Sequence, residues 1–415
     1  MAVITNVREQ GIALPPDLVP TPEDIIARAE AIAPSLIGRQ AETEERTFYA
    51  EDTHEEFARA GLYRILVPRR YGGYELGVDT FMRVVMTLTR ACPSTGWMYC
   101  LGAAHALAVA TLFDERAQAE IFDGDFICPA TIMPGGTAER TADGDWVING
   151  MWSYCSGSPY ATHFLGHVLV SPAEGEPPVP MLFIAPRSQW RRLDDWGGQL
   201  GLKGSGSHSI VIENARIPDY FTIDTHLSQV TVTEGTPGLA LHGNPQYGGG
   251  PLSFMILESA VLAVGMALGA LDAYEDLMRS RTTSFPPITG RAENPDFQYW
   301  YGQAAGMIAT AETAITGALQ QWIDTCARGS AAFTGEQELR LAGIGREVVK
   351  LSWNAVQQYL FPTAGSSSVR NGERVERVWR DMSTLHTHAG VSIYLSSMAS
   401  REYAMARFGI VDPHF

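Results

Sequence analysis

Apolar residues recur every three or four positions along much of the first 125 residues, which is the spacing of one buried face of an α-helix. Thr21-Pro22, followed by two acidic residues, is typical of a helix start, so the first helix is predicted from there. A second helix is predicted around residues 52–60, and two more between residues 80 and 122, with a break at Cys92-Pro93. We therefore expect residues 1–125 to form an N-terminal helical domain.

The pattern changes near residue 126 to short β-rich runs separated by Gly, Pro and Asp, which is typical of strands joined by turns. Asn149-Gly150 is a strong hairpin signal, so a second strand is predicted directly after it. These features predict a compact β domain, a barrel or sandwich, over residues 126–232, then a linker over residues 233–252 that is rich in Gly, Thr and Pro. The clearest runs are residues 146–148, 167–170, 181–184 and 209–213.

A helical stripe returns after the linker. Phe254, Leu257 and Val261 begin it, and cations at the end of this first long helix suit the negative end of the helix dipole. We therefore expect a four-helix bundle over residues 253–415, and the predicted fold class is α+β, mostly α. The further long helices are predicted at residues 297–327, 336–359 and 380–400.

The composition is that of an ordinary soluble globular protein, with 45% hydrophobic and 18% charged residues. A net charge of −16 opposes binding to nucleic acid or to an anionic membrane, since either partner would need a basic patch. The first residues lack the pattern of a signal peptide, and we judge no later segment apolar enough to span a bilayer, so a cytoplasmic protein is expected. The five cysteines lack paired metal-ligand spacing, so we expect reduced thiols and no metal.

Three stretches hold candidate site chemistry on the residues alone. Residues 152–158 combine small hydroxyls with glycine, which allows close approach by a flat polar ring; an edge strand running into a loop fits equally well. Trp97 and His105 stand about two helical turns apart, and this spacing alone favours a packed aromatic and a core histidine over a ligand site. Residues 364–368 are small and lead into a helix, which favours an anion site.

Longer motifs are similar to those of a known family. Residues 61–73 read GLYRILVPRRYGG, residues 149–157 read NGMWSYCSG, and residues 94–97 read STGW, with His105 downstream. They resemble the acyl-CoA dehydrogenase superfamily, and within it the flavin hydroxylases that act on phenols and other aromatics; the resemblance covers nearly the whole chain. It implies reduced FMN or FAD and O2 as cofactors, a small aromatic substrate and a homotetramer. A separate NAD(P)H:flavin reductase is implied as partner, since no GxGxxG fingerprint follows a predicted strand.

The resemblance also implies roles for individual residues. Trp97 and His105 border the substrate ring, with His105 hydrogen-bonding a phenol or N–H group, and Thr131 faces the flavin or the substrate. Tyr247 belongs to the loop before the first bundle helix, which has no cation, so indoles, uncharged phenols or polycyclic aromatics are expected. The glycine-rich residues 196–207 resemble a structural loop and are given little catalytic weight. The residues implied to bind the flavin are Trp152, Ser156 and Gly157 for the ring, and Arg281, Gly365, Ser366 and Ser367 for the phosphate tail.

One catalytic group separates the two reactions of this superfamily. Dehydrogenases need a glutamate base; its usual position is Ala389 here, while Glu258, at the other family position, keeps a thioester dehydrogenase as an alternative. His388 stands beside the vacated position, and the resemblance places it with Ser156 near flavin C4a and N5, where oxygen adds as a hydroperoxide. We therefore predict a two-component monooxygenase that hydroxylates an aromatic through a C4a-hydroperoxyflavin. A non-catalytic flavin-binding scaffold is the other alternative, which the retained Ser156 and His388 disfavour.

Overall fold

The computed structural model describes residues 19–171 and 176–410, and its N-terminal part is helical. Thr21 begins the first helix as predicted: its hydroxyl accepts from the Asp24 N–H, and the Asp24 carboxylate accepts from the Thr21 N–H. Residues 1–18, on which the absence of a signal peptide was judged, lie outside the described residues. The helices are α2 (Pro22–Gly38), α3 (Gln40–Arg46), α4 (Glu51–Ala60), α5 (Val78–Ala91), α6 (Pro93–Ala103), α7 (His105–Leu112) and α8 (Glu115–Ile121).

The two helices predicted between residues 80 and 122 are in fact four shorter ones. The break at Cys92-Pro93 is present, but α6 also ends at Ala103, and His105 is the first residue of α7. A further break follows at Phe113, where Asp114 caps α8 by accepting from the Ala117 N–H. Trp97 and His105 therefore lie on two successive helices and not on one continuous face.

The middle part of the chain forms a single seven-stranded sheet with the order β5-β6-β2-β1-β3-β4-β7. The pair β1–β3 is parallel and the other pairs are antiparallel. Every predicted run falls within or across the start of a strand. The strands are β1 (Gly136–Arg140), β2 (Trp146–Trp152), β3 (His163–Val170), β4 (Val179–Pro186), β5 (Arg191–Arg192), β6 (Ile210–Ile217) and β7 (Thr222–Ile223).

The hairpin predicted at Asn149-Gly150 is wrong, because β2 runs straight through this dipeptide. The turn comes earlier, around Gly144, between β1 and β2. Asn149-Gly150 marks a shift in register against β6, and a Cβ on Gly150 would lie only 2.5 Å from the Gly135 carbonyl oxygen. The glycine is therefore needed for close strand approach. After Trp152 the chain leaves the sheet as a loop, so no second strand follows.

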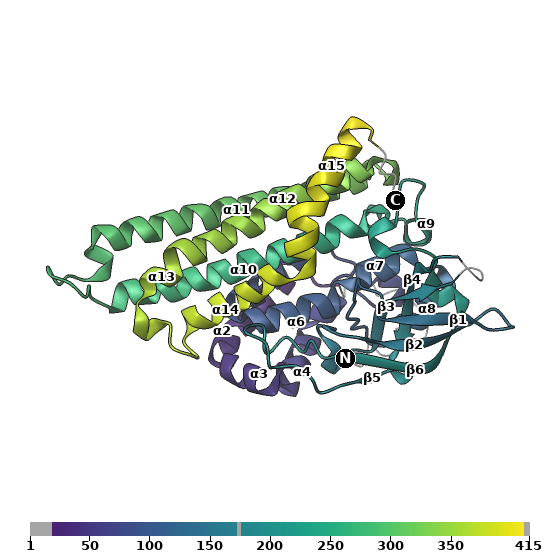
Figure 1. Cartoon of the computed structure of the whole chain (residues 1–415), viewed down its shortest axis with the longest axis horizontal. Coiled ribbons are helices and arrows are strands. Elements are labelled where there is room, and N and C mark those ends of the chain that lie inside the picture. The colour runs from purple at the N-terminus through teal and green to yellow at the C-terminus, as the bar shows by residue number, and fades with distance from the viewer. Residues whose placement is uncertain (1–18, 172–175, 411–415) are drawn as a thin grey trace.

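The C-terminal part is a bundle of long helices, which lies against the helical and β regions in Figure 1. The helix predicted over residues 380–400 is interrupted, because α14 ends at Thr387 and a π-helical segment follows His388. The fold class predicted from sequence is confirmed. The elements are α9 (Pro237–His242), α10 (Pro251–Ser280), α11 (Pro295–Ala327), α12 (Gly335–Asn354), the π-helical η11 (Ala355–Leu360), α13 (Phe361–Ala364), α14 (Arg374–Thr387), the π-helical η13 (Gly390–Met398) and α15 (Ala399–Phe408).

Helix α10 corrects one expectation about membranes. It is long and apolar enough to cross a bilayer by length and composition, with a mean hydropathy of 2.0 in its most apolar window. However, 78% of that window is buried inside the protein. The apolar sequence reflects a helix surrounded by α5, α11, α12 and α14, since a core helix is hydrophobic all round.

Candidate functional site

Trp97, Ser156 and His388, three residues singled out from the sequence, meet where the three parts of the chain join. The Trp97 indole on α6 donates its Nε1–H to Ser156 Oγ at 2.9 Å. The His388 ring, at the end of α14, packs edge-on against the Trp97 ring with a centroid distance of 5.7 Å. Helix α6, the loop after β2 and the end of α14 thus each contribute one side chain.

Two further serines extend this site and were given little weight from the sequence. Ser156 Oγ lies 2.7 Å from Ser207 Oγ, which lies 2.6 Å from Ser205 Oγ, and all three residues are buried. Because Trp97 donates to Ser156, that hydroxyl is already an acceptor. If Ser205 donates to Ser207 and Ser207 to Ser156, the Ser156 proton is free for a ligand. The alternation of Gly and Ser in residues 204–207 was the available signal.

The loop that carries Ser156 is held by backbone contacts. Gly157 has φ 94°, a conformation that favours glycine, and a Cβ there would lie 3.2 Å from Met98 O on α6. The Gly157 N–H donates to the Ser205 carbonyl at 3.3 Å. The glycine therefore serves close packing onto α6. This position fixes Ser156 between α6 and the glycine-rich loop.

His388 occupies a junction in the bundle and remains accessible. Its backbone N–H closes α14 by donating to Leu385 O at 3.0 Å, and its ψ of 133° takes the chain out of the helix. The residue is exposed, yet the surrounding protein lowers the pKa of its imidazole by desolvation. Trp97 and Ser156 beside it are buried, so His388 is the exposed member of this group of three, and we call the side of the group that it occupies the recess. His388 has a neutral imidazole near pH 7, able to accept a proton or to donate a hydrogen bond.

His105 lies in a different environment. It is buried, its Nδ1 is 2.6 Å from Cys128 O, and burial lowers its pKa. Since a carbonyl can only accept, Nδ1 carries the proton and Nε2 of the neutral ring is an acceptor. The imidazole that packs on Trp97 is that of His388, and the predicted place of His105 beside the substrate ring stays a prediction.

Thr131 and Tyr247 each bury a hydroxyl that has no hydrogen-bond partner in the described structure. Such a group costs about 1–3 kcal/mol if it stays unsatisfied. Burial raises the pKa of Tyr247 well above its usual range, so its phenol is a donor at all relevant pH values. A bound ligand or water would satisfy both hydroxyls, and their predicted role in substrate binding stays a prediction.

Trp152 is a core residue of the sheet. It is 2% exposed and donates its indole N–H to His167 O at 2.8 Å. Phe164 and Phe183 pack against its ring at centroid distances of 5.5 and 5.4 Å. These contacts give Trp152 a place in the core of the sheet, and its expected contact with the flavin stays a prediction.

The residues predicted to hold the flavin tail come together with one another. Arg281 donates to the Ser367 hydroxyl, and Ser366 and Ser367 are exposed. Gly365, with φ 91°, begins this turn, and Arg291 donates to the preceding Ala364 carbonyl at 2.9 Å. The cluster lies where α10 and α13 end, at the end of the bundle that points away from the sheet (Figure 1). One chain therefore places it away from Ser156.

Glu258, the alternative base, is unsuited to that task. It is 1% exposed, its Oε1 has no partner in the described structure, and burial raises its pKa well above the usual range. Burial therefore favours the protonated form, and a carboxyl must be ionised to abstract a proton. The other family position is the exposed Ala389.

Family models match both ends of the chain: the acyl-CoA dehydrogenase N-terminal domain over residues 23–120 and the C-terminal domain over residues 257–393. A pigment production hydroxylase of a Rhodococcus species is 29% identical over 384 residues, which cover 91% of this chain and 95% of that protein. HsaA of Rhodococcus jostii, a flavin-dependent monooxygenase oxygenase subunit, is 29% identical over 392 residues, or 91% of this chain and 96% of its own.

Solved structures share the whole fold. The 3-HSA hydroxylase of Rhodococcus sp. RHA1 has a TM-score of 0.83 at 24% identity, over 94% of this chain and 98% of that one. XiaF from Streptomyces, solved with FADH2 and glycerol, has a TM-score of 0.83 at 21% identity, over 100% of this chain and 98% of its own. The resemblance drawn from the motifs is confirmed. This chain therefore belongs to the acyl-CoA dehydrogenase family, among its flavin-dependent hydroxylases.

Proposed function

We propose that the protein is the oxygenase component of a two-component flavin-dependent monooxygenase that hydroxylates a neutral aromatic compound. The observation that carries this proposal is the meeting of Trp97, Ser156 and His388 at one accessible recess. Relatives that cover most of the chain support it, among them an FADH2-dependent resorcinol hydroxylase from Rhizobium, whose name describes an oxygenase component. A reductase that supplies the flavin in its reduced form is the implied partner.

The residues at this recess fit a flavin ring. Ser156 offers a hydroxyl that is held by Trp97 and Ser207, and His388 offers an accessible neutral imidazole. When bound, the reduced flavin supplies the electrons and protons with which O2 gives one atom to the product and one to water. A donor and an imidazole are the two kinds of group that control protons at such a ring.

The chain's own residues would divide this work. His388 holds or moves the proton at the oxygen that is being reduced, because it is neutral and accessible. Ser156 donates a hydrogen bond to the ring edge and so slows the wasteful release of hydrogen peroxide. Trp97 covers one side of the recess and helps exclude water, which strengthens both interactions.

The substrate region also favours a neutral ring. Tyr247 donates from a buried phenol, and His105 presents Nε2 as an acceptor, so a phenol or N–H group finds complementary partners. The Asn244–Gly250 stretch carries no cation that would pair with a carboxylate. We therefore propose phenols, indoles or polycyclic aromatics without an acidic group.

The position of the Arg281 cluster supports assembly with a second copy of the chain, as in the homotetramer that the resemblance implies. It lies away from Ser156 on the same chain and exposes two serine hydroxyls beside a guanidinium, a suitable site for a phosphate group. A second copy that brings this cluster to the recess would complete the site. The flavin ring would then rest on one chain and the phosphate tail on another.

A reconstitution experiment tests the proposed reaction. The purified protein is incubated with NADH, FMN or FAD and a panel of neutral aromatics, with and without a flavin reductase. We expect hydroxylated product only when the reductase is present. Oxidation of acyl thioesters with an electron acceptor in the absence of O2 would instead identify a dehydrogenase and overturn the proposal.

A further inference from the structure

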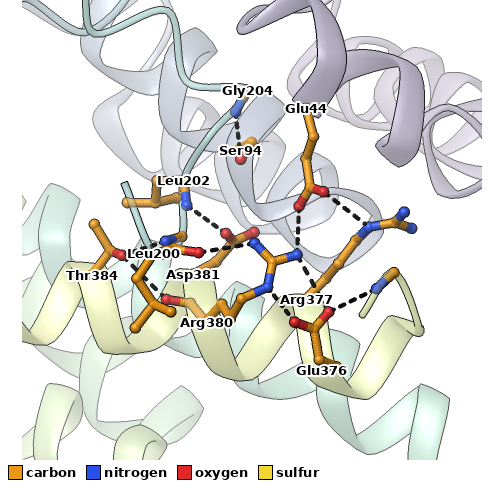
Figure 2. Close-up of polar contacts among 12 residues, drawn as sticks. Glu44, Ser94, Leu200, Leu202, Gly204, Glu376, Arg377, Arg380, Asp381 and Thr384 are labelled. Atoms are coloured by element: carbon orange, nitrogen blue, oxygen red, sulfur yellow. Dashed lines mark hydrogen bonds and ion pairs between the residues drawn. The ribbon is translucent and has the colours of Figure 1, made fainter. Parts of the chain in front are cut away.

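The glycine-rich loop that carries Ser205 and Ser207 is attached to α14 by three hydrogen bonds (Figure 2). The Leu202 N–H donates to the Asp381 carboxyl, and the Gly201 N–H donates to Thr384 Oγ1 at 2.9 Å. In the opposite direction, Arg380 Nη1 donates to Leu200 O at 2.9 Å. Side chains from little more than one turn of α14 therefore bind the loop backbone, with Asp381 between Arg380 and Thr384 in sequence.

Close packing on two sides restricts the position of the loop. A Cβ on Gly201 would lie 2.1 Å from Arg380 O, so loop and helix backbones touch directly. On the opposite side, the Gly204 N–H donates to Ser94 Oγ at 3.3 Å, and a Cβ on Gly204 would lie 2.4 Å from Thr43 Cγ2. The loop is therefore enclosed between α14 and the N-terminal helices. Small shifts of α14 must be passed on to it.

Helix α14 is itself fixed at this point. Arg380 pairs with Glu376 on the same helix and with Glu44 on α3 at 2.9 Å, and Arg377 approaches Glu44 at 3.4 Å. Figure 2 shows these ion pairs beside the Asp381 carboxyl. Asp381 is 3% exposed. A buried carboxyl is costly, so its presence here calls for a local reason.

Asp381 is connected along the chain to both His388 and the serines that contact Ser156. His388 follows it by seven residues, about two turns along α14. Ser205 and Ser207 follow Leu202, the residue that Asp381 binds, by three and five residues, and lead to Ser156. The hydrogen bond from Leu202 to Asp381 is therefore one of the three that join the helix carrying the imidazole to the loop carrying the two serines.

We propose that Asp381 is a positioning residue that holds the Ser205–Ser207–Ser156 hydroxyl chain in place relative to His388. This inference rests on the proposed function, because it assigns the pair a joint role in controlling protons at the flavin. Its carboxyl touches neither hydroxyl chain nor imidazole and acts through the Leu202 backbone and through α14. Loosening this bond lets the Ser156 hydroxyl drift while His388 stays.

Two substitutions of Asp381 distinguish the loss of its hydrogen-bond acceptor from the loss of its ionisable carboxyl. Asp381→Asn keeps a carbonyl oxygen for the Leu202 N–H, whereas Asp381→Ala removes the acceptor. Thr384→Val removes the acceptor of the Gly201 N–H, together with a hydroxyl bond to Arg380 O within α14, and is a milder second way to loosen the loop. Glu338→Ala is the matched control: this carboxyl is equally buried and accepts the Ser253 N–H at 2.8 Å, but on α12, away from the loop.

The first readout is hydrogen exchange of residues 200–207 in the protein without flavin. We expect Asp381→Ala to speed exchange at Leu202 about fivefold or more, the effect of losing one hydrogen bond. Thr384→Val should give a smaller increase, and Asp381→Asn and Glu338→Ala should match the parent. Unchanged exchange in both Asp381→Ala and Thr384→Val would overturn the proposal.

The second readout is the rate of hydrogen peroxide release when the reduced-flavin complex meets O2 without an aromatic substrate. We expect release to be several-fold faster in Asp381→Ala, as in Ser156→Ala, and near parental in Asp381→Asn. Faster loop exchange with parental peroxide release would show that the bond does not position Ser156, and would overturn the proposal. A parent that does not retard peroxide release would instead count against the proposed function, and loop exchange alone would then decide the role of Asp381.

Discussion

The recess at Trp97 and the cluster at Arg281 are two predicted halves of one flavin site, and they are built in opposite ways. Trp97 and Ser156 are buried, and hydrogen bonds fix them before any ligand arrives. Arg281, by contrast, pairs with the exposed Ser367 in a turn at the free end of the bundle. The first half is preorganised within one chain. The second is exposed, and its predicted phosphate would come with a flavin whose ring rests on another chain.

Because of this difference, substitutions in the recess should change reaction rates, and substitutions in the Arg281 cluster should change flavin affinity. A preorganised group lowers the cost of reorganisation during the reaction, so its removal should change a rate constant. An exposed cation that meets a phosphate contributes to binding and leaves the chemistry unchanged. Variants of the two regions should therefore fail in different measurements.

The largest effect is expected for His388→Ala. If this imidazole holds or moves the proton during oxygen reduction, the rate of flavin oxidation after mixing with O2 should fall by about 10²–10⁴-fold. The affinity for reduced flavin should change little. Stopped-flow absorbance gives the rate and equilibrium titration the affinity. A rate like that of the parent would leave His388 as a packing residue.

The next largest effect is expected at the other half of the site. Arg281→Ala should weaken flavin binding by about 10- to 100-fold, since a charge-assisted hydrogen bond contributes roughly 1.5–3 kcal/mol. Arg279→Ala is the matched control on the same helix, because Arg279 pairs with Glu275 instead. Fluorescence titration with FMN and FAD measures both. Equal, small losses for the two variants would remove the phosphate role of Arg281.

Ser156→Ala should have a smaller effect that sharpens the comparison within the recess. Flavin oxidation should begin at a nearly normal rate, but hydrogen peroxide should be released several-fold faster, as expected for one hydrogen bond of about 0.5–1.5 kcal/mol. Ser253→Ala, which removes a buried hydroxyl that donates to Gly250 O at 3.1 Å at the start of α10, serves as control. Equal peroxide release in the two variants would argue against a special place for Ser156.

The buried carboxyl of Asp381 predicts that the stability of the protein depends on pH. Burial raises the pKa of Asp381 to about 7, so the folded state holds a proton that the unfolded state has lost. Stability should therefore fall as pH rises from about 4 to about 7, and by about 1 kcal/mol between pH 6 and pH 8. Asp381→Asn should remove this part of the slope, as measured by urea unfolding at several pH values. An unaltered slope would place the titration elsewhere.

The smallest effect is expected for Glu258→Gln. Since burial raises the pKa of this carboxyl and favours its neutral form, the neutral amide is a close replacement, and oxygen-dependent turnover should stay within about threefold of the parent. Steady-state assays with the reductase measure this turnover. A loss of several orders of magnitude with folding unchanged would revive the dehydrogenase alternative.

Much of the fold follows from local sequence patterns. The capping box at Thr21, the break at Pro93 and the long apolar stripe of α10 depend on neighbouring residues, and each was placed correctly. Asn149-Gly150 was misread because the same dipeptide serves a turn or a bulge, and only contact with β1 and β6 decides. Local patterns predict elements well when no distant strand competes.

The site was predictable only in part. Ser156 and His388 were found through motifs, but their contact with Trp97 joins residues 59 positions apart and further, which spacing cannot reveal. Ser205 and Ser207 were missed because serines are common in loops, and the sequence does not show that their hydroxyls contact Ser156 and each other. The motif also did not show that the Trp152 side chain is buried in the sheet, because that depends on distant strands.

The most direct test of the account is a single turnover with labelled oxygen. The protein is mixed without air with one equivalent of reduced flavin and a neutral aromatic that the reconstituted system accepts, and is then exposed to isotopically labelled O2. The account predicts product with one labelled oxygen atom, in a yield that falls in both Ser156→Ala and His388→Ala. Product oxygen that comes from water, or product yields unaffected by both substitutions, would contradict it.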